Sequence, residues 1–360
     1  MYAGFQQDNK EYCLLPEKMI KSDSGFLFLK GVGQLPEGYY LQKIIVTTYD
    51  LDLSVLREQM RIYPDADWTV ICDGSGICDT ENASADISGY ETVIMPVEMP
   101  MSTFRIAGNP ARLAFHPKVR LLVYGNRKGN RMYRLSVGSR NMTRHNNIEC
   151  EICAEGYLSD TSEKRNSDLI FFFRNLEAFS RSQKKIPEEF LSELSHVAFE
   201  PVSEIPLKNF EILFTGAFYP AWYNAVKDKL GVMLCDYDEL LIISPNLSDR
   251  IIQRVRDSLD STRTCTVITC KKAYEDLSDE LKASPGSRMR FEFYQNETYR
   301  LHAKAYFSRK GDCIKGYIGS RNATEVARLK TLEAMAYFET EASGRSIRGI
   351  ADCFVKGLSI

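Results

Sequence analysis

Two copies of one pattern of polar residues stand in the sequence, and their chemistry suits phosphoryl transfer. Each copy begins with a His-x-Lys triplet, His116 to Lys118 in the first and His302 to Lys304 in the second. Only four histidines occur in the chain, so half of them stand in matched settings. Residues i and i+2 share a face of a β-strand, which predicts that the His and Lys of each triplet project together. One histidine and one lysine from each half would then meet in a shared cleft.

The tetrapeptide Gly-Ser-Arg-Asn follows each triplet, at residues 138–141 and 319–322. The Gly-Ser pair is expected to end a strand, and the asparagine amide just beyond it can donate a hydrogen bond to an oxygen on the same side. The arginines either bind phosphate or stabilise the lobes through ion pairs, and both interpretations stay open. The expected substrate-binding residues are the serines and arginines of both tetrapeptides, Ser139, Arg140, Ser320 and Arg321.

A glutamate follows each tetrapeptide where a further β-rich segment begins. Glu149 lies eight residues after Asn141, and Glu333 lies eleven residues after Asn322. Such a carboxylate can accept a hydrogen bond from the far N–H of a histidine ring, which sets the tautomer and the orientation of that ring. Glu151 is an alternative to Glu149, and a surface position is the alternative for either glutamate.

These groups together fit the cleavage of a phosphodiester. Catalysis must neutralise charge on the equatorial oxygens, which lysine and asparagine side chains can do, and must protonate a poor leaving alkoxide. One neutral histidine can attack phosphorus, while the other, when protonated, acts as general acid and then takes a proton from water. The expected catalytic residues are those of both copies, His116, Lys118, Asn141, Glu149, His302, Lys304, Asn322 and Glu333.

No metal and no cofactor is expected. The only C-x-x-C pair is Cys150 and Cys153, and no second pair or histidine cluster stands near it to complete the four ligands of structural zinc. The first residues lack the basic start and the apolar run of a secretory signal. No stretch approaches the roughly 18–20 apolar residues of a membrane helix. A cytoplasmic protein with reduced thiols and no membrane partner is therefore expected.

The repeat extends beyond the motifs. Segments 43–60 and 239–259 each combine a buried strand with an amphipathic helix, for which Asp52 and Ser248 are candidate N-caps. A strand-like run precedes each segment, at 26–33 and at 210–218. Another β-rich run follows each segment before the motifs begin. Alternating strands and helices favour the α/β class.

We therefore predict two similar α/β/α sandwich lobes with mixed sheets, related by a pseudo-two-fold axis. The first lobe is expected at 1–175, a helical connection at 176–205 and the second lobe at 206–360.

Positive charge is concentrated around the two motifs. Residues 112–144 carry nine Lys or Arg and no acidic residue, and residues 299–330 carry eight basic residues against two acidic ones. The whole chain has a net charge of -2. This distribution is expected where each motif must attract an anion, although two solvated basic hairpins would give the same pattern.

The paired H-x-K and G-S-x-N motifs with a later glutamate resemble the phospholipase D superfamily. Within it, "FHPKVRLLVY", "RLSVGSRNMT" and "NNIE" are similar to the tyrosyl-DNA phosphodiesterase branch and to related bacterial nucleases. The resemblance implies a covalent phosphohistidine, with His116 as nucleophile and His302 as general acid. On the residues alone these two roles are interchangeable.

One departure from the superfamily pattern bears on the substrate. Many members carry an aspartate five residues after the lysine, where this chain has Val123 and Arg309. The tyrosyl-DNA branch also lacks that aspartate, so the departure disfavours the lipid-directed members.

The leading hypothesis is a metal-independent phosphodiesterase acting on DNA, either a nuclease or an enzyme that removes 3'-adducts. RNA stays open as a substrate, and no obligate partner is readable. The first alternative is a phospholipid hydrolase or transferase of the same superfamily. The second is a nucleic-acid-binding module of a restriction or defence complex; a repair complex is a further possible setting.

Overall fold

The computed structural model describes residues 37–355 except 83, 107–108, 161–165, 217–218, 284–287 and 295–297, together with two short strands near the N-terminus. Those strands are β1 (Cys13–Leu14) and β2 (Gln34–Leu35). The strand predicted at 26–33 lies outside the described residues. No helix in the described ranges combines the length and the apolar character that crossing a bilayer requires.

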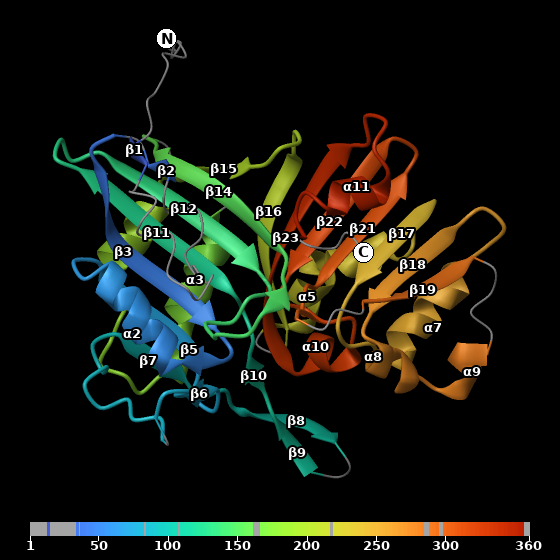
Figure 1. Cartoon of the computed structure of the whole chain (residues 1–360), viewed down its shortest axis with the longest axis horizontal. Helices are drawn as coiled ribbons and strands as arrows, with labels where there is room; N and C mark the ends of the chain where they lie inside the picture. Colours follow the sequence, from blue (N-terminus) through green and yellow to red (C-terminus); the bar gives the residue numbers. More distant parts are fainter. Residues whose placement is uncertain are drawn as a thin grey trace.

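The first lobe is built on a seven-stranded mixed sheet (Figure 1). Its three strands β3, β5 and β7 run parallel, and the other four are added in antiparallel fashion. In spatial order the strands are β15 (Val197–Val202), β14 (Glu151–Leu158), β12 (Arg131–Gly138), β11 (Val119–Asn126), β3 (Tyr39–Thr48), β5 (Asp67–Asp73) and β7 (Ile94–Val97).

The second lobe repeats this order in an eight-stranded sheet. Strands β17, β18 and β19 are parallel, as are their counterparts β3, β5 and β7. The order is β10 (Ala114–Phe115), β23 (Thr331–Glu341), β22 (Cys313–Gly319), β21 (Ala305–Lys310), β17 (Glu239–Ile243), β18 (Thr264–Thr269) and β19 (Met289–Phe293), with β16 (Lys208–Gly216) also paired to β23. The predicted α/β class with mixed sheets is confirmed, and the matching strand orders are what a pseudo-two-fold relation predicts.

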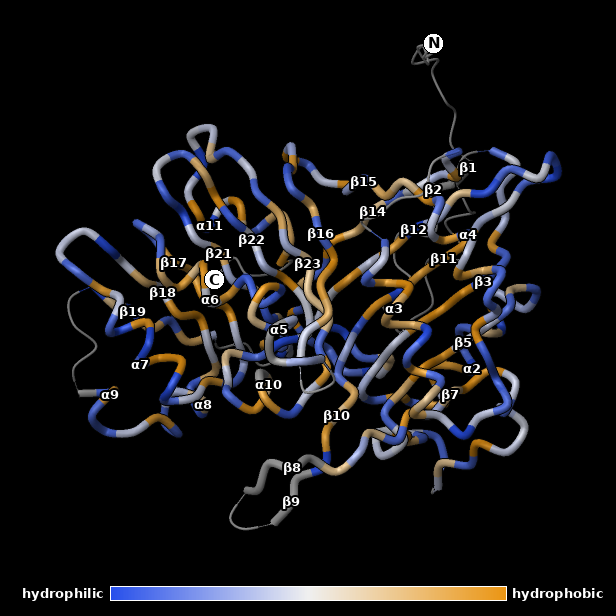
Figure 2. Tube along the Cα trace, turned by 180° about the vertical axis from the view of Figure 1, so that it is seen from behind, coloured by the Kyte–Doolittle hydropathy of each residue, from blue (hydrophilic) through white to orange (hydrophobic). Residues whose placement is uncertain are grey.

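Three apolar layers hold the two sheets. The outer face of the first sheet packs on α2 (Leu53–Ile62), and that of the second packs on α6 (Lys229–Met233), α7 (Asp249–Ser258) and α9 (Asp279–Ala283). The inner faces of both sheets share one core with α3 (Ser167–Leu176), α4 (Glu188–Leu194) and α11 (Ile347–Ala351). Hydrophobic stretches accordingly follow the strands of both lobes (Figure 2).

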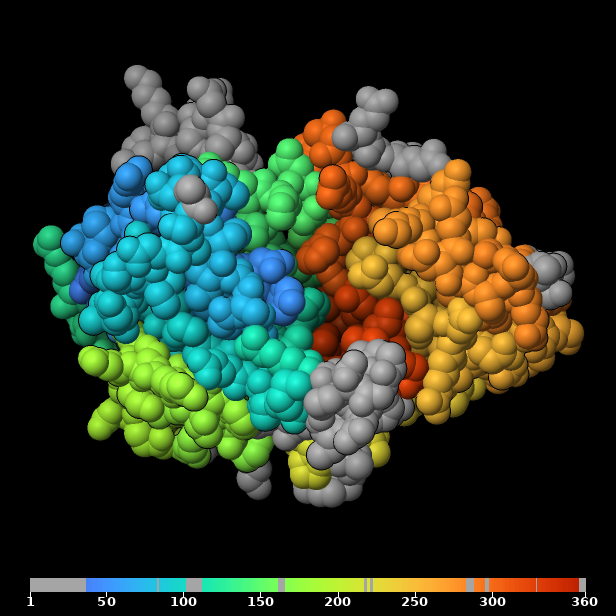
Figure 3. Space-filling view, turned by 90° about the horizontal axis from the view of Figure 1, so that it is seen from below, coloured from blue at the N-terminus to red at the C-terminus, as the bar shows by residue number. Residues whose placement is uncertain are grey.

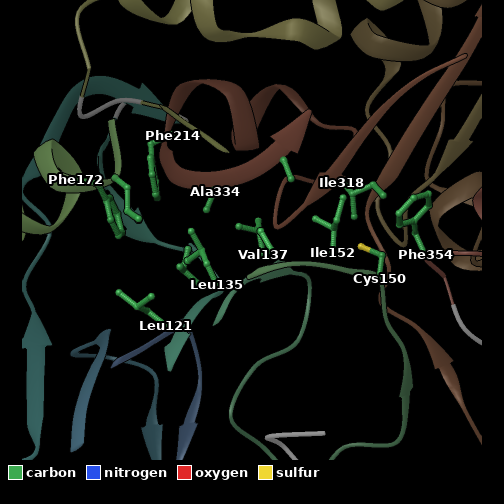
Figure 4. Close-up of a cluster of buried hydrophobic side chains, with 14 of the residues drawn as sticks. Leu121, Leu135, Val137, Cys150, Ile152, Phe172, Phe214, Ile318, Ala334 and Phe354 are labelled. Atoms are coloured by element: carbon green, nitrogen blue, oxygen red, sulfur yellow. The ribbon is translucent and has the colours of Figure 1, made fainter. Parts of the chain in front are cut away.

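The shared core joins the lobes through side chains from both. Val137 and Ile152 of the first sheet lie beside Ile318 of the second (Figure 4). Phe172 of α3 stacks on Phe214 of β16, with ring centroids 4.0 Å apart. Burial of apolar area at this junction, about 25 cal/mol per Å² removed from water, stabilises one arrangement of the two lobes.

Two expectations about local structure need correction. The connection predicted as helical at 176–205 contains η2 (Glu177–Phe179) and α4 but also the strand β15, which extends the first sheet. Asp52 caps α2 by accepting from the backbone N–H of Ser54. Ser248 precedes α7 but makes no such bond, because its hydroxyl accepts from the N–H of Glu325 instead. The domain boundaries themselves stay a prediction.

The remaining elements are short. They are β4 (Leu51–Asp52), β6 (Ile77–Cys78), β8 (Met101–Ile106), β9 (Asn109–Arg112), β13 (Asn147–Ile148), β20 (Arg300–Leu301), α5 (Ala221–Lys227), α8 (Lys271–Glu275) and α10 (Glu325–Leu329).

Candidate active site

The two His-x-Lys triplets lie just before long strands rather than within them. Residues 116–118 connect β10 to β11, and residues 302–304 connect β20 to β21. The expected strand geometry is therefore wrong for both triplets. Pro117 needs no place in a ladder, which removes the conflict that a proline within a strand would create.

Each triplet is held by the opposite lobe. Strand β10, just before His116, pairs in parallel with β23 of the second lobe, and the N–H of His116 donates to the carbonyl of Leu332 at 3.0 Å. Reciprocally, β20 pairs in parallel with β13 of the first lobe, and the N–H of His302 donates to the carbonyl of Ile148 at 2.9 Å. The lobes thus exchange short strands at the site.

The same crossing brings each glutamate to the histidine of the other lobe. Nδ1 of His116 lies 2.9 Å from Oε2 of Glu333, and Nδ1 of His302 lies 2.9 Å from Oε2 of Glu149. Glu151, the alternative to Glu149, pairs with Arg120 instead. A histidine that donates from Nδ1 presents the lone pair of Nε2, which is the nitrogen a nucleophile requires.

The two serines stand behind the glutamates. Ser139 donates to Glu149 and Ser320 donates to Glu333, and both hydroxyls also accept a backbone N–H at 3.0 Å. Both serines are fully buried. The structure therefore places both serines as supports of the glutamates. The sequence interpretation expected them to bind substrate instead.

Both lysines are buried against the backbone of their own triplets. Nζ of Lys118 donates to the carbonyl of His116 at 2.8 Å, and Nζ of Lys304 donates to that of His302 at 2.6 Å. Burial lowers the pKa of Lys118 well below its ordinary value, and the charge of Lys304 adds to the effect. Burial likewise lowers the pKa of Lys304 to about 8. Two closely spaced ammonium groups in a low-dielectric site favour binding of an anion.

Burial also lowers the pKa of both histidines. It lowers the pKa of His302 to about 4, and Lys304 adds to the effect while Glu149 opposes it. The pKa of His116 is lowered by burial, against the attraction of Glu333. Although burial raises the pKa of Glu149, His302 and Lys304 hold it at about 2, so this carboxylate is ionised at neutral pH.

The two asparagines have different partners. Nδ2 of Asn141 donates to Asp50 at 2.8 Å, and its Oδ1 accepts from the backbone N–H of Tyr49 at 3.3 Å. In the second lobe Oδ1 of Asn322 accepts from Asn246 at 3.4 Å. Thr48 and Ser244 each accept an N–H from the residue after the tetrapeptide, so Tyr49 corresponds to Pro245 in the second lobe. A proline has no backbone N–H to donate.

The arginines of the tetrapeptides differ as well. Arg321 is 2% exposed and pairs with Asp228 at 2.6 Å, which raises the pKa of its guanidinium further even though burial opposes it. It therefore lies in the interior of the second lobe, where its ion pair matches the stabilising interpretation. Arg140 is half-buried near Glu149, and burial lowers its pKa. A role in substrate binding stays a prediction for Arg140.

Among the described residues, no group of three or more His, Cys, Asp and Glu side chains is arranged to hold a metal ion. The Cys150 thiol is buried and donates to the carbonyl of Lys304 at 3.3 Å, and Cys153 lies beside Ser136. These cysteines belong to the packing of the strands.

A hollow separates the two lobes on the face that Figure 3 shows, with blue first-lobe atoms on one side and orange and red second-lobe atoms on the other.

Neither the models of protein families nor the curated proteins give a match to this sequence.

Solved structures do match. Yeast tyrosyl-DNA phosphodiesterase is 14% identical over 84% of this chain and 83% of its own, with a TM-score of 0.53. Phosphatidylserine synthase from Haemophilus influenzae is 12% identical over 86% of this chain and 80% of its own, with a TM-score of 0.52. Both belong to the phospholipase D superfamily. The chain has the phospholipase D fold.

Within this phospholipase D fold, Asp50 is a site residue that the sequence interpretation missed. It accepts from Asn141, and burial raises its pKa while Lys118 opposes that shift. Residues 48–52 correspond to 244–248, since Thr48 and Ser244 each accept an N–H from the residue after the tetrapeptide. Aligning the two halves would have placed Asp50 opposite Asn246 and revealed one carboxylate without a counterpart.

The basic windows need a correction too. Many of their arginines are neutralised by carboxylates from elsewhere in the phospholipase D fold, including Glu151, Glu155, Glu193 and Asp228. The local excess of positive charge in the sequence therefore overstates the charge that faces solvent. His145 is exposed and lines a cavity with His302.

Proposed function

We propose that this protein is a phosphodiesterase that acts on DNA without a metal, through a phosphohistidine intermediate. The observation that carries the proposal is the reciprocal pairing of each histidine with the glutamate of the other lobe. An imidazole fixed in this way has one nitrogen committed to the carboxylate and the other available for chemistry. Two such imidazoles are what attack and leaving-group protonation require.

The lysines support binding of the scissile phosphate. Burial and the charge of Lys304 lower the pKa of Lys118, and burial lowers the pKa of Lys304. A bound phosphodiester anion therefore relieves an unfavourable concentration of positive charge. The same anion raises the pKa of His302, since it offsets the effect of Lys304. Substrate binding thereby prepares the general acid.

The two histidines differ in exposure, and the resemblance to the tyrosyl-DNA phosphodiesterase branch assigns them different roles. The side chain of His116 is 14% exposed and that of His302 is 25% exposed. We assign the attack on phosphorus to His116: its Nε2 forms the P–N bond while the bond from phosphorus to the leaving oxygen breaks. His302 gives its proton to that oxygen, then removes a proton from water, whose oxygen displaces His116 from phosphorus.

DNA as the substrate draws on two observations. The structure-matched yeast enzyme acts on a tyrosyl-DNA phosphodiester, as its name states, and the aspartate of the lipid-directed motif is replaced by Val123 and Arg309. The phosphatidylserine synthase has the same fold, so the fold by itself does not choose the substrate.

Hydrolysis of bis(p-nitrophenyl) phosphate in EDTA tests the reaction. His116→Ala should lower kcat/KM by about 10³-fold or more, because the nucleophile is lost. His196→Ala, a change at the half-buried histidine after α4, is the matched control and should leave the rate unchanged. A wild-type activity that EDTA abolishes and that His116→Ala leaves intact would contradict the proposal.

A further inference from the structure

Two neighbouring cavities, one of them lined by His302, share two of their lining residues. The first, of about 610 Å³, lies between the lobes and is lined by His302, Asp50, Asn141, Arg144 and Arg300 among others. The second, of about 890 Å³, lies in the second lobe and is lined by Lys272, Tyr294 and Tyr299 among others. Arg300 and Leu301 line both. We call the two together the trough.

The trough begins at the proposed general acid and not at the proposed nucleophile. His302 lines the first cavity, whereas His116 lines neither. A general acid must lie within hydrogen-bond reach of the oxygen it protonates. The leaving group of a phosphodiester bound between the histidines therefore enters the trough.

Two cations in the trough lack a carboxylate partner. Among the described residues, the side chains of Arg300 and Lys272 are exposed and make no ion pair or hydrogen bond. Arg144, by contrast, is balanced by Glu58 and Glu81. Asp50 and Asp276 are the acidic lining residues in the described part of the trough. Unpaired cations spaced along a groove match the phosphates of a strand.

The remaining lining groups suit nucleotides. Tyr299 is 44% exposed, Tyr294 is half-buried, and both line the cavity that Lys272 borders. Tyrosine rings beside basic groups form stacking platforms for the bases of single strands. Each cavity falls within the roughly 300–1,000 Å³ of small-molecule sites, so each has room for about one nucleotide.

We infer that the trough binds the nucleotides on the leaving side of a single DNA strand, so that the scissile phosphate lies inside the strand and not at a blocked end. This inference rests on the proposed function, whose reaction it assigns to a nuclease. The bond from phosphorus to the sugar oxygen of the leaving nucleotide breaks, and that oxygen receives the proton of His302. A tyrosyl leaving group has no phosphates that could pair with the cations of the trough.

Two substrates and three variants test the inference. One oligonucleotide carries several nucleotides beyond the scissile phosphate, and the other carries p-nitrophenol there. Arg300→Ala and Lys272→Ala should each lower kcat/KM on the first about 10-fold and stay within about twofold on the second. Lys271→Ala is the matched control, because Lys271 is an exposed neighbour that pairs with Glu275 and does not line the trough. Equal losses on both substrates would overturn the inference.

A binding measurement separates this inference from the proposed function. Fluorescence anisotropy of a labelled single strand should show a salt dependence of log Kd whose slope falls by about 0.7 for each cation removed. An unchanged slope in Arg300→Ala and Lys272→Ala would overturn the trough as a strand site. A wild-type protein that cleaves neither substrate would overturn the proposed function, and the salt slopes would still decide whether the trough binds DNA.

Discussion

His116 and Glu333 are separated by most of the chain, yet the histidine Nδ1 lies 2.9 Å from the glutamate Oε2. His302 and Glu149 repeat this relationship from the opposite lobes at the same distance. Neither lobe therefore contains a complete histidine–glutamate pair, and each depends on the strand that the other contributes.

His302→Asn should trap the intermediate. With a p-nitrophenyl ester the leaving group needs no proton, so His116 can still attack, whereas no base remains to activate water. Mass spectrometry of the quenched protein should find a mass increase on the peptide that contains His116. His116→Asn should form no adduct. An adduct on His302 in that variant would instead exchange the two roles.

Glu333→Gln should lower kcat by about 100-fold or more while preserving the fold, because an amide keeps the shape but does not hold the imidazole as a carboxylate does. The loss of Glu333's charge also lowers the pKa of His116, so the acid limb of the pH profile should shift to lower pH. Glu339→Gln is the control on the same strand, where the carboxylate binds Asn209. An unshifted acid limb would contradict the pairing as a catalytic device.

The pH dependence of kcat/KM should have two descending segments. His302 acts when protonated, and since its pKa is about 4, the active fraction falls as pH rises above 4. Lys304, with a pKa of about 8, loses its charge above pH 8, so the slope of log kcat/KM should steepen from about -1 to about -2 there. Lys304→Arg should remove the break at pH 8 because a guanidinium stays charged. A break that persists in this variant belongs to another group.

Asp50→Asn and Asp50→Ala should have different effects. Asparagine can still accept from Asn141, and it removes a negative charge near Lys118, so KM for a DNA phosphodiester should fall roughly 3- to 10-fold at low salt. The difference should shrink as ionic strength rises. Alanine also removes the acceptor, and kcat should drop as Asn141 loses its orientation. Steady-state kinetics across a salt series would contradict this if both variants behaved alike.

Arg321→Ala should affect stability more than substrate binding. The buried ion pair with Asp228 would be broken, at a cost of about 3 kcal/mol in the free energy of unfolding. Urea denaturation measures this loss. KM of the folded variant should stay within about twofold of wild type. A large rise in KM without loss of stability would instead show that Arg321 binds the substrate.

The sequence by itself determined the repeat, the two triplets and the α/β class with mixed sheets. These features are local, since hydrophobic periodicity and motif spacing are set within short windows. The choice of Glu149 over Glu151 follows from the tertiary structure, because only the exchange of β10 and β20 between lobes decides which carboxylate meets which histidine.

Burial likewise came from the tertiary structure alone. Ser139, Ser320 and Arg321 look equally available in the sequence, and the packing of the sheets encloses all three. Long-range ion pairs neutralise much of the basic windows, whereas Arg300 has no carboxylate partner among the described residues. Such pairings join residues far apart in the chain, so they depend on the topology of the sheets and leave no periodic signal in the sequence.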